Sequence, residues 1–191
     1  MRHFLKSKIM GFDISQERTG WCVMSEGKLI SWGNIKCPDM FKKTSFKTTN
    51  FSNWLNWYML QVRGLVQTHK PEYVAMEDLN VRYVNTAKIL LQFQAAGKIG
   101  IMQADPKIML HMYNNITVKS NMGVITRKSK IDKDIVDRAK LYGQKAVKIQ
   151  MVDIINDKYD TEFTYEENDE ADAIALAETL FDKWRDNHGV L

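Results

Sequence analysis

The chain has 191 residues, of which 45% are hydrophobic and 26% are charged, and this is the balance of an ordinary globular domain. A chain of this length can bury a core of useful size, so it needs neither a disulfide framework nor a structural metal in order to fold. We therefore expect a single domain over residues 1–191.

The net charge of +4 hides a strong asymmetry along the chain. Residues 119–148 hold nine Lys or Arg and three acids, whereas residues 152–191 hold twelve acids and three bases. A basic region beside an acidic one is typical of a protein that binds a polyanion and also contains a metal site. A solvated basic helix followed by a solvated acidic helix would give the same counts, so charge alone leaves both interpretations open.

Cysteine usage and hydropathy indicate the cellular compartment. The two cysteines, Cys22 and Cys37, form no CxxC motif, which favours reduced thiols in a cytosolic protein. Residues 1–8 contain no apolar signal core, and no window reaches the length of an apolar membrane span. We therefore expect a cytoplasmic protein without a membrane partner.

The first part of the chain has the pattern of a β-meander. Apolar runs predict strands over residues 8–15, 19–24 and 29–36. Gly27 marks a tight turn between the second and the third strand, because glycine readily adopts the positive φ that such turns require.

The rest of the chain alternates between helices and short strands. The predicted helices cover residues 51–70, 86–102, 146–155 and 167–184, and a strand is predicted over residues 72–77. Residues 107–113 read as either a fifth strand or a short helix, and residues 114–145 are the least regular part of the chain. This order predicts an α/β fold, in which a mixed sheet carries helices on both faces.

Four acidic residues lie where a nuclease would need them: Asp13, Glu77, Asp169 and Asp172. Asp13 lies within the first strand, Glu77 ends the strand at residues 72–77, and the other two share one face of the last helix. A carboxylate embedded in apolar sequence is costly unless it is paired, and a divalent metal is the natural partner of several converging carboxylates. Two ions held by shared carboxylates can hydrolyse a phosphodiester bond.

Each acid also has an ordinary explanation. Asp13 could cap the turn after its strand, Glu77 could pair with a base, and Asp169 could be the N-cap of its helix. The ordinary explanation is preferred for each acid alone, whereas the four together favour a site for Mg²⁺, which prefers oxygen ligands. Zinc patterns such as HExxH or paired CxxC motifs are absent from the sequence.

Four short motifs follow one another along the chain: Gly11-Phe12-Asp13, Thr19-Gly20, Ala75-Met76-Glu77 and Asp169-Glu170-Ala171-Asp172-Ala173. Their order resembles that of the RuvC family of Holliday-junction resolvases, and the resemblance runs from about residue 8 to residue 178. It implies an RNase H-like fold with a mixed five-stranded sheet. The compact size points to a phage member of the family.

The resemblance also implies roles for single residues. Asp13, Glu77, Asp169 and Asp172 match the four metal-binding acids, and Lys119 matches a catalytic lysine near the scissile phosphate. Further DNA contacts are expected from Lys119 and Lys145 and from three bases in the long region 124–142, namely Arg127, Lys128 and Lys130. This region either widens the DNA footprint or is a mobile loop.

The function implied by the resemblance is resolution of four-way DNA junctions in recombination and repair. The expected enzyme is an endonuclease that uses Mg²⁺, with Mn²⁺ as a substitute, and that leaves 5′-phosphate ends. It would act as a homodimer, with the apolar side of the helix at residues 86–102 as the dimer surface, in the cytoplasm of a bacterium or of a phage-infected host.

The sequence departs from the family pattern in two places. Relatives commonly have Pro-Gly after the first acid, where this chain has Ile14-Ser15, and they often have an aromatic residue where this chain has Asn80, with Tyr83 as the nearest aromatic. These departures leave alternatives open: a looser nuclease for forks, flaps and three-way junctions, a junction-binding protein without catalysis, or an enzyme that cuts RNA:DNA hybrids.

Overall fold

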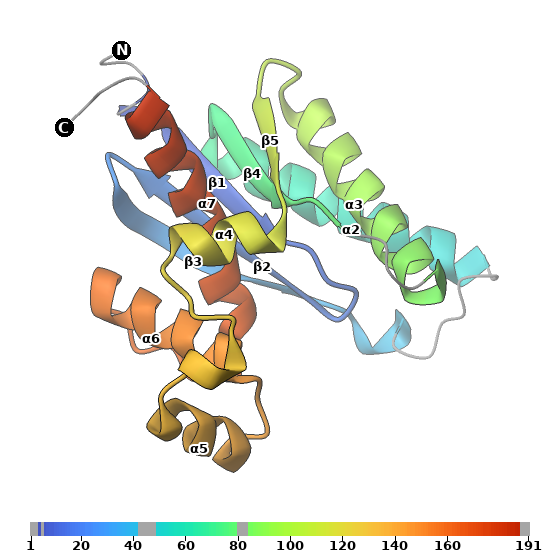
Figure 1. Cartoon of the computed structure of the whole chain (residues 1–191). Coiled ribbons are helices and arrows are strands. Elements are labelled where there is room, and N and C mark those ends of the chain that lie inside the picture. The colour runs from blue at the N-terminus through green and yellow to red at the C-terminus, as the bar shows by residue number, and fades with distance from the viewer. Residues whose placement is uncertain (1–3, 5, 42–48, 80–83, 188–191) are drawn as a thin grey trace.

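The computed structural model describes residues 4, 6–41, 49–79 and 84–187, and within them five strands form one sheet (Figure 1). The strands are β1 (Lys8–Asp13), β2 (Arg18–Ser25), β3 (Lys28–Lys36), β4 (Tyr73–Glu77) and β5 (Met109–Tyr113).

The sheet is mixed, and its strand order is β3-β2-β1-β4-β5. Strand β2 runs antiparallel to both β1 and β3, whereas β4 runs parallel to both β1 and β5. The carboxyl ends of β1, β4 and β5 therefore meet at one edge of the sheet, which is where open α/β sheets place their functional residues.

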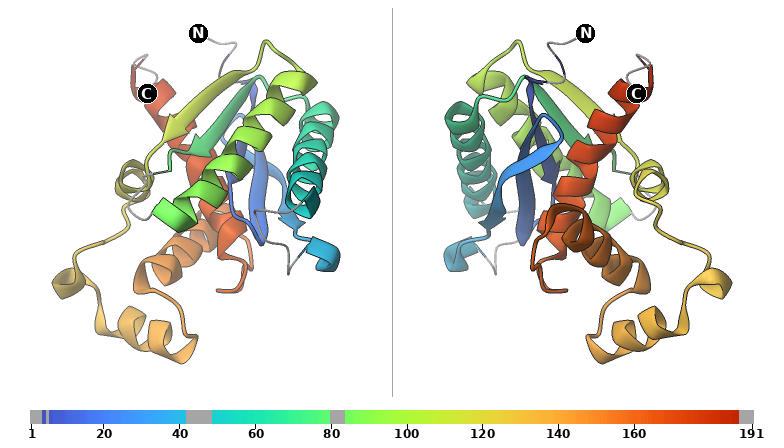
Figure 2. Two further views of the ribbon diagram at one scale, coloured as in Figure 1. Left: turned by 90° about the vertical axis from the view of Figure 1, so that its right-hand side faces the viewer. Right: turned by 90° about the vertical axis from the view of Figure 1, so that its left-hand side faces the viewer.

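Helices cover both faces of the sheet (Figure 2). The α-helices are α2 (Thr49–His69), α3 (Val84–Ala104), α4 (Asn115–Asn121), α5 (Lys133–Leu141), α6 (Ala146–Tyr159) and α7 (Asn168–Asn187), and the short 3-10 helices are η1 (Asp39–Phe41) and η2 (Lys128–Lys130). Helices α2 and α3 close one hydrophobic core, and α4, α6 and α7 close the other.

The central strands contribute side chains to both cores, because successive residues of a strand face opposite sides of the sheet. Ile9 and Ala75 pack under α7, whereas their neighbours Met10 and Val74 pack under α2. All four are almost inaccessible to solvent. Burial on both faces explains why these strands read as continuous apolar runs in the sequence.

Helix α7 lies very close to the sheet at two glycines. A Cβ atom added to Gly11 would lie 2.1 Å from the carbonyl oxygen of Ala173, and one added to Gly20 would lie 1.9 Å from the carbonyl oxygen of Asp169. A larger residue at either position would displace the helix backbone. These two contacts therefore fix the height of the first turns of α7 above β1 and β2.

The turn between β1 and β2 closes without proline or glycine. Strand β1 ends at Asp13, two residues before the predicted boundary, because the chain turns away at residues 14–17. The Ser15 hydroxyl donates to the carbonyl oxygen of Arg18 (2.8 Å) and accepts from its amide nitrogen (3.0 Å), and Thr19 Oγ1 accepts from the Ser15 amide (3.2 Å). Side-chain hydrogen bonds thus hold this turn in the absence of glycine.

The segment over residues 124–142, which we call the basic arm, contains η2 and α5 and is anchored to α6. The Gln150 side chain accepts from the amide of Ile125 (2.9 Å) and donates to its carbonyl (3.1 Å). Arg138 pairs with Asp153 (2.9 Å) and donates to the Tyr165 hydroxyl (2.6 Å). These contacts give the arm a defined structure. It extends beyond α6 at the bottom of Figure 1.

The predicted fold is confirmed: the sheet is mixed, it has five strands, and helices lie on both faces. Residues 109–113 form a strand, which decides between the two interpretations of residues 107–113. None of the helices in the described part of the chain combines the length and the apolar character that crossing a membrane requires.

The contact at Gly20 leads to a prediction about stability. Gly20→Ala should lower the free energy of unfolding by about 2 kcal/mol or more, because the new methyl group overlaps the α7 backbone. Gly64→Ala is the matched control, since a Cβ there meets nothing within 4 Å and α2 should gain up to about 1 kcal/mol. Urea denaturation measures both values, and equal stability of Gly20→Ala and the unmodified chain would contradict the close packing of α7.

Candidate active site

Asp13 and Glu77 lie side by side at the carboxyl edge of the sheet. Strands β1 and β4 are parallel and pair Phe12 with Met76, so the next residue of each strand is one of these acids. The Glu77 carboxylate accepts from Asn115 Nδ2 (3.1 Å). The strand register alone therefore brings together two acids that are far apart in the sequence.

Helix α7 supplies the other two acids from its first two turns. Asp169 and Asp172 are three residues apart, so they share one helix face above the sheet edge. The N-terminal end of a helix carries a partial positive charge, which favours carboxylates at these positions. The Gly20 contact sets where the first of these turns lies, because it presses the Asp169 backbone onto β2.

A small pocket lies between these elements, with a volume of about 10 Å³, which is the space of a single water molecule. Its lining residues are Asp13, Glu77, Asn115, Val118, Lys119, Met151, Asp172 and Leu176. Three predicted acids and the predicted catalytic lysine therefore surround one pocket. Asp169 is not among the lining residues, although its charge raises the pKa of both Asp13 and Asp172.

The acids make one another difficult to ionise. Desolvation by burial raises the pKa of Asp13 well above its ordinary value, and the charges of Asp172 and Glu77 raise it further. Desolvation also raises the pKa of Asp172, to about 6. Burial raises the pKa of Asp169, which nearby cations partly offset. Such crowding of negative charge marks a place where a cation would be strongly attracted.

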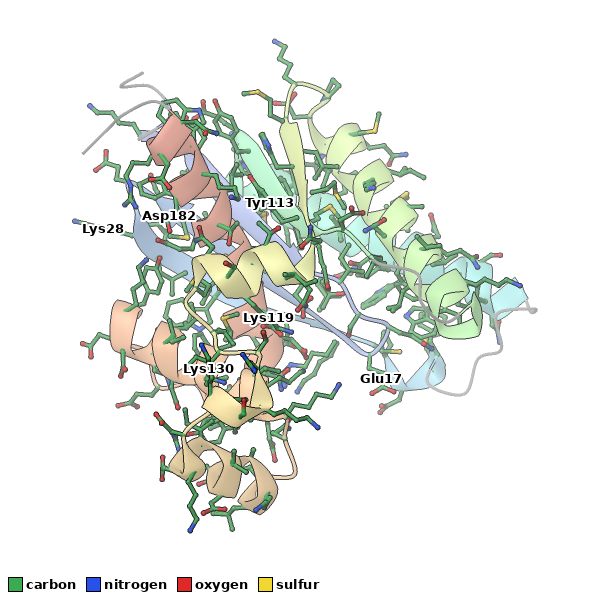
Figure 3. The ribbon with its side chains drawn as sticks, in the orientation of Figure 1. Glu17, Lys28, Tyr113, Lys119, Lys130 and Asp182 are labelled. Atoms are coloured by element: carbon green, nitrogen blue, oxygen red, sulfur yellow. The ribbon has the colours of Figure 1, made fainter. Side chains whose placement is uncertain are left out.

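Two lysines lie near the acids. Lys119, on α4, lines the pocket, and its charge lowers the pKa of Asp172 (Figure 3). Lys148, on α6, lowers the pKa values of Asp13, Asp169 and Asp172, and its ammonium donates to the Asn168 side chain at the start of α7. Lys148 has a larger part in this site than the sequence indicated.

Lys145, which was predicted to contact DNA, is not among the residues that line the pocket. It is the N-cap residue of α6 and its side chain is exposed, whereas Lys148, one turn further along the helix, faces the acids. Because residues three apart share one helix face, the two lysines differ in their position along α6 and not in the face that they occupy.

A third cation, Arg18, was not predicted to belong to the site. Its Nε atom lies 3.8 Å from Asp169 Oδ2, and its charge lowers the pKa of Asp169. Arg18 begins β2, immediately before the Thr19-Gly20 motif. The position was therefore visible in the sequence, but nothing there connected it with α7.

The basic arm presents the remaining predicted DNA contacts. Arg127, Lys128 and Lys130 all have exposed side chains, and Figure 3 shows Lys130 on η2, which leads from α4 toward α5. Asn80 and Tyr83, at which the sequence departs from the family pattern, lie outside the described residues.

The donor set suits a hard divalent cation. The pocket offers carboxylate oxygens from three elements and an amide side chain, with no cysteine or histidine among its lining residues, and Mg²⁺ prefers such oxygen ligands. In the part of the chain that the structure describes, no three His, Cys, Asp or Glu residues lie close enough together to form a complete metal site. The carboxylates would therefore have to move closer together to share an ion.

Comparison with known protein families gives one match that covers most of the chain. The family model described as "Crossover junction endodeoxyribonuclease RuvC" matches residues 9–179. No curated protein matches the sequence significantly.

Solved structures share the fold at low sequence identity. RuvC from Thermus thermophilus in complex with a Holliday junction substrate superposes with a TM-score of 0.62 and 18% identity, over 94% of this chain and 95% of that one. A second structure of Thermus thermophilus RuvC gives a TM-score of 0.63 and 16% identity, over 95% and 96%. The yeast mitochondrial Holliday junction resolvase Ydc2 gives 0.54 and 16%, over 91% and 78%.

The raised pKa values of the acids predict how stability changes with pH when divalent ions are removed. Asp172 has a higher pKa in the folded chain than in the unfolded one, so the folded chain holds more protons between about pH 4 and pH 6. The contribution of this group to stability is therefore most favourable below about pH 4 and declines as the pH rises through about 6. Asp13 shifts in the same direction.

Asp172→Asn should remove this penalty. In EDTA at pH 7.5, the variant should be more stable than the unmodified chain by on the order of 1–3 kcal/mol, and the difference should shrink toward pH 4. Thermal denaturation across this pH range measures the effect. Asp105→Asn, which changes an exposed residue beyond the end of α3, is the control. A difference that grows toward acidic pH would contradict the assigned crowding of the acids.

Proposed function

The chain belongs to the RuvC family of crossover junction endodeoxyribonucleases, which confirms the predicted resemblance, and from this premise we propose how its residues perform the reaction. The family makes the protein an endonuclease that resolves DNA junctions. The observation that carries the residue assignment is the pocket in which Asp13, Glu77, Asp172 and Lys119 meet.

We propose that Asp13, Glu77 and Asp172 hold divalent metal at the pocket, with Asp169 as the fourth acid. The chemistry fits Mg²⁺, for which Mn²⁺ would substitute. Bound ions would supply an acidified water and stabilise the leaving oxygen of the phosphodiester, leaving a 5′-phosphate and a 3′-hydroxyl. The chain itself must first release the protons that burial and repulsion favour on Asp13 and Asp172, so metal binding should weaken below about pH 6.

The lysines act on the substrate phosphate. Lys119 lines the pocket, so its ammonium can offset the charge that develops on the scissile phosphate. Lys148 neutralises part of the acid cluster from the other side and is tied to Asn168 at the start of α7. The exposed bases of the arm, Arg127, Lys128 and Lys130, together with Lys145, would hold the DNA backbone outside the pocket.

A homodimer remains part of this proposal. Helix α3 buries one side against α2, while Leu91, Ile99 and Met102 stay 40%, 47% and 64% exposed. Large apolar side chains gathered on one helix are typical of a surface that a partner covers. Twofold symmetry of two chains would match the symmetry of a four-way junction.

The acid pair on the sheet provides the first test of catalysis. Glu77→Gln or Asp13→Asn should lower junction cleavage in Mg²⁺ by about 100-fold or more, because a metal ligand worth several kcal/mol is lost. Binding of a four-way junction should survive or tighten, because a negative charge facing phosphate is removed. Glu72→Gln, on the residue just before the opposite end of β4, is the control. Cleavage by Glu77→Gln at the unmodified rate would refute the assignment.

The basic arm provides a separate test of binding. Lys128→Gln with Lys130→Gln should weaken junction binding and make its dependence on salt shallower, by about one unit of log–log slope per lost phosphate contact. Lys28→Gln is the control, because Lys28 lies at the β2–β3 turn, away from the arm (Figure 3). Fluorescence anisotropy at several salt concentrations measures the slope, and an unchanged slope would exclude the arm from the DNA surface.

A further inference from the structure

Arg18 connects the start of β2 to the first turn of α7 and to the loop before it through three separate contacts. Its Nη2 atom donates to Glu170 Oε1 (2.5 Å), its Nη1 atom donates to the carbonyl oxygen of Glu166 (3.1 Å), and its Nε atom faces Asp169 Oδ2 at 3.8 Å. The planar guanidinium can make such contacts in several directions at once, which a lysine ammonium on a flexible stem cannot reproduce.

Glu170 is buried, with only 3% of its surface exposed, and it anchors the Arg18 side chain. The Asn34 side chain on β3 donates to the same oxygen, Oε1, at 2.6 Å. Three elements, β2, β3 and α7, therefore meet at this one carboxylate. The backbone of Arg18 is held in β2, and its guanidinium is held by the buried Glu170 carboxylate.

This cluster is a costly way to pack a helix onto a sheet. A buried ion pair is often no more stabilising than apolar residues of the same volume, because both charges lose their hydration. Two of its atoms, Arg18 Nε and Glu170 Oε2, are buried and have no hydrogen-bond partner among the described residues. The donor left over on Arg18 is the one that faces Asp169, one of the four acids of the proposed site.

We propose that Arg18, held by Glu170 and Asn34, is a positioning residue that orients the Asp169 carboxylate for metal binding. The inference rests on the proposed function and adds a residue to it. Arg18 Nε lies at ion-pair distance from Asp169 Oδ2, so its charge and its unused N–H favour one orientation of the carboxylate. Residues that orient a metal ligand in this way commonly change metal affinity by 10–100-fold when they are lost.

The experiment replaces both partners of the buried pair, with Arg18→Met and Glu170→Met in one chain. This change keeps the net charge and the approximate volume and leaves no single charge buried, so the chain should fold. The control is Lys158→Met with Glu178→Met, because Glu178 is a second buried acid of α7, also 3% exposed, and it pairs with Lys158 away from the pocket.

Mn²⁺ binding to the protein without DNA, measured by calorimetry, is the first readout. The Arg18/Glu170 variant should bind Mn²⁺ at least about 10-fold more weakly than the unmodified chain, whereas the Lys158/Glu178 variant should bind it equally well. The Mg²⁺ concentration for half-maximal junction cleavage should rise by a similar factor. Thermal stability and junction affinity in EDTA should change no more in the test variant than in the control.

Three outcomes separate the possibilities. Unchanged Mn²⁺ affinity in the Arg18/Glu170 variant would overturn the inference and leave Arg18 a purely structural clamp, and tighter Mn²⁺ binding would show that Arg18 competes with the metal. Absence of Mn²⁺ binding to the unmodified chain would instead overturn the proposed function.

Arg18→Lys provides a second variant in case the double replacement does not fold. It keeps the charge beside Glu170 but loses the guanidinium geometry that reaches Asp169. A raised Mg²⁺ requirement is expected in a folded protein, and an unchanged requirement would count against the positioning role.

Discussion

The contact between α7 and the sheet at Gly11 and Gly20 is the constraint on which the rest of the structure depends. The helix backbone there occupies the space in which a side chain at either of these two positions would lie. Helix α7 is itself rich in small residues, and its alanines at positions 171, 173, 175 and 177 are all fully buried. Such close backbone packing allows α7 little movement toward the sheet or along it. Packing, and not the interactions of the acids themselves, therefore determines where the start of α7 and its acids lie.

The position of α7 brings charged groups together at the sheet edge, and this lowers the stability of the fold. Packing brings Asp172 toward Asp13 and Glu77, and the pKa values of the two aspartates rise because their ionised forms are crowded and poorly hydrated. Lys119 and Lys148 offset only part of this charge. A fold that tolerates such repulsion gives up stability at the proposed metal site, which is the usual compromise at functional positions.

The sequence was sufficient for those parts of the site that follow from the periodicity of strands. Asp13 and Glu77 could be predicted because a charged residue interrupts or ends an apolar run, and the parallel pairing of β1 and β4 then places them together. Asp169 and Asp172 were less certain, because acids at the start of a helix are common, and their assignment depended on the family motif.

The cations around the acids could not be predicted in the same way. The sequence did not single out Lys148, because Lys148 lies one turn from Lys145 on the same side of α6 and nothing in the sequence shows which turn of α6 lies beside the acids. The basic arm escaped prediction because polar contacts, such as those of Arg138, hold it in place, and hydrophobic periodicity does not detect such contacts. Pairing of Arg18 with Glu170 joins residues at opposite ends of the chain, and only the folded structure brings them together.

The position of α7 near the end of the described chain has a consequence for biosynthesis. A nascent chain on the ribosome completes β1 and β4 long before α7 emerges, so it has only two of the four acids and an uncovered sheet face above Gly11. Contacts between segments so distant in sequence form late in folding. The complete set of carboxylates therefore exists only after α7 has been synthesised, and chains that stop before α7 cannot assemble the proposed site.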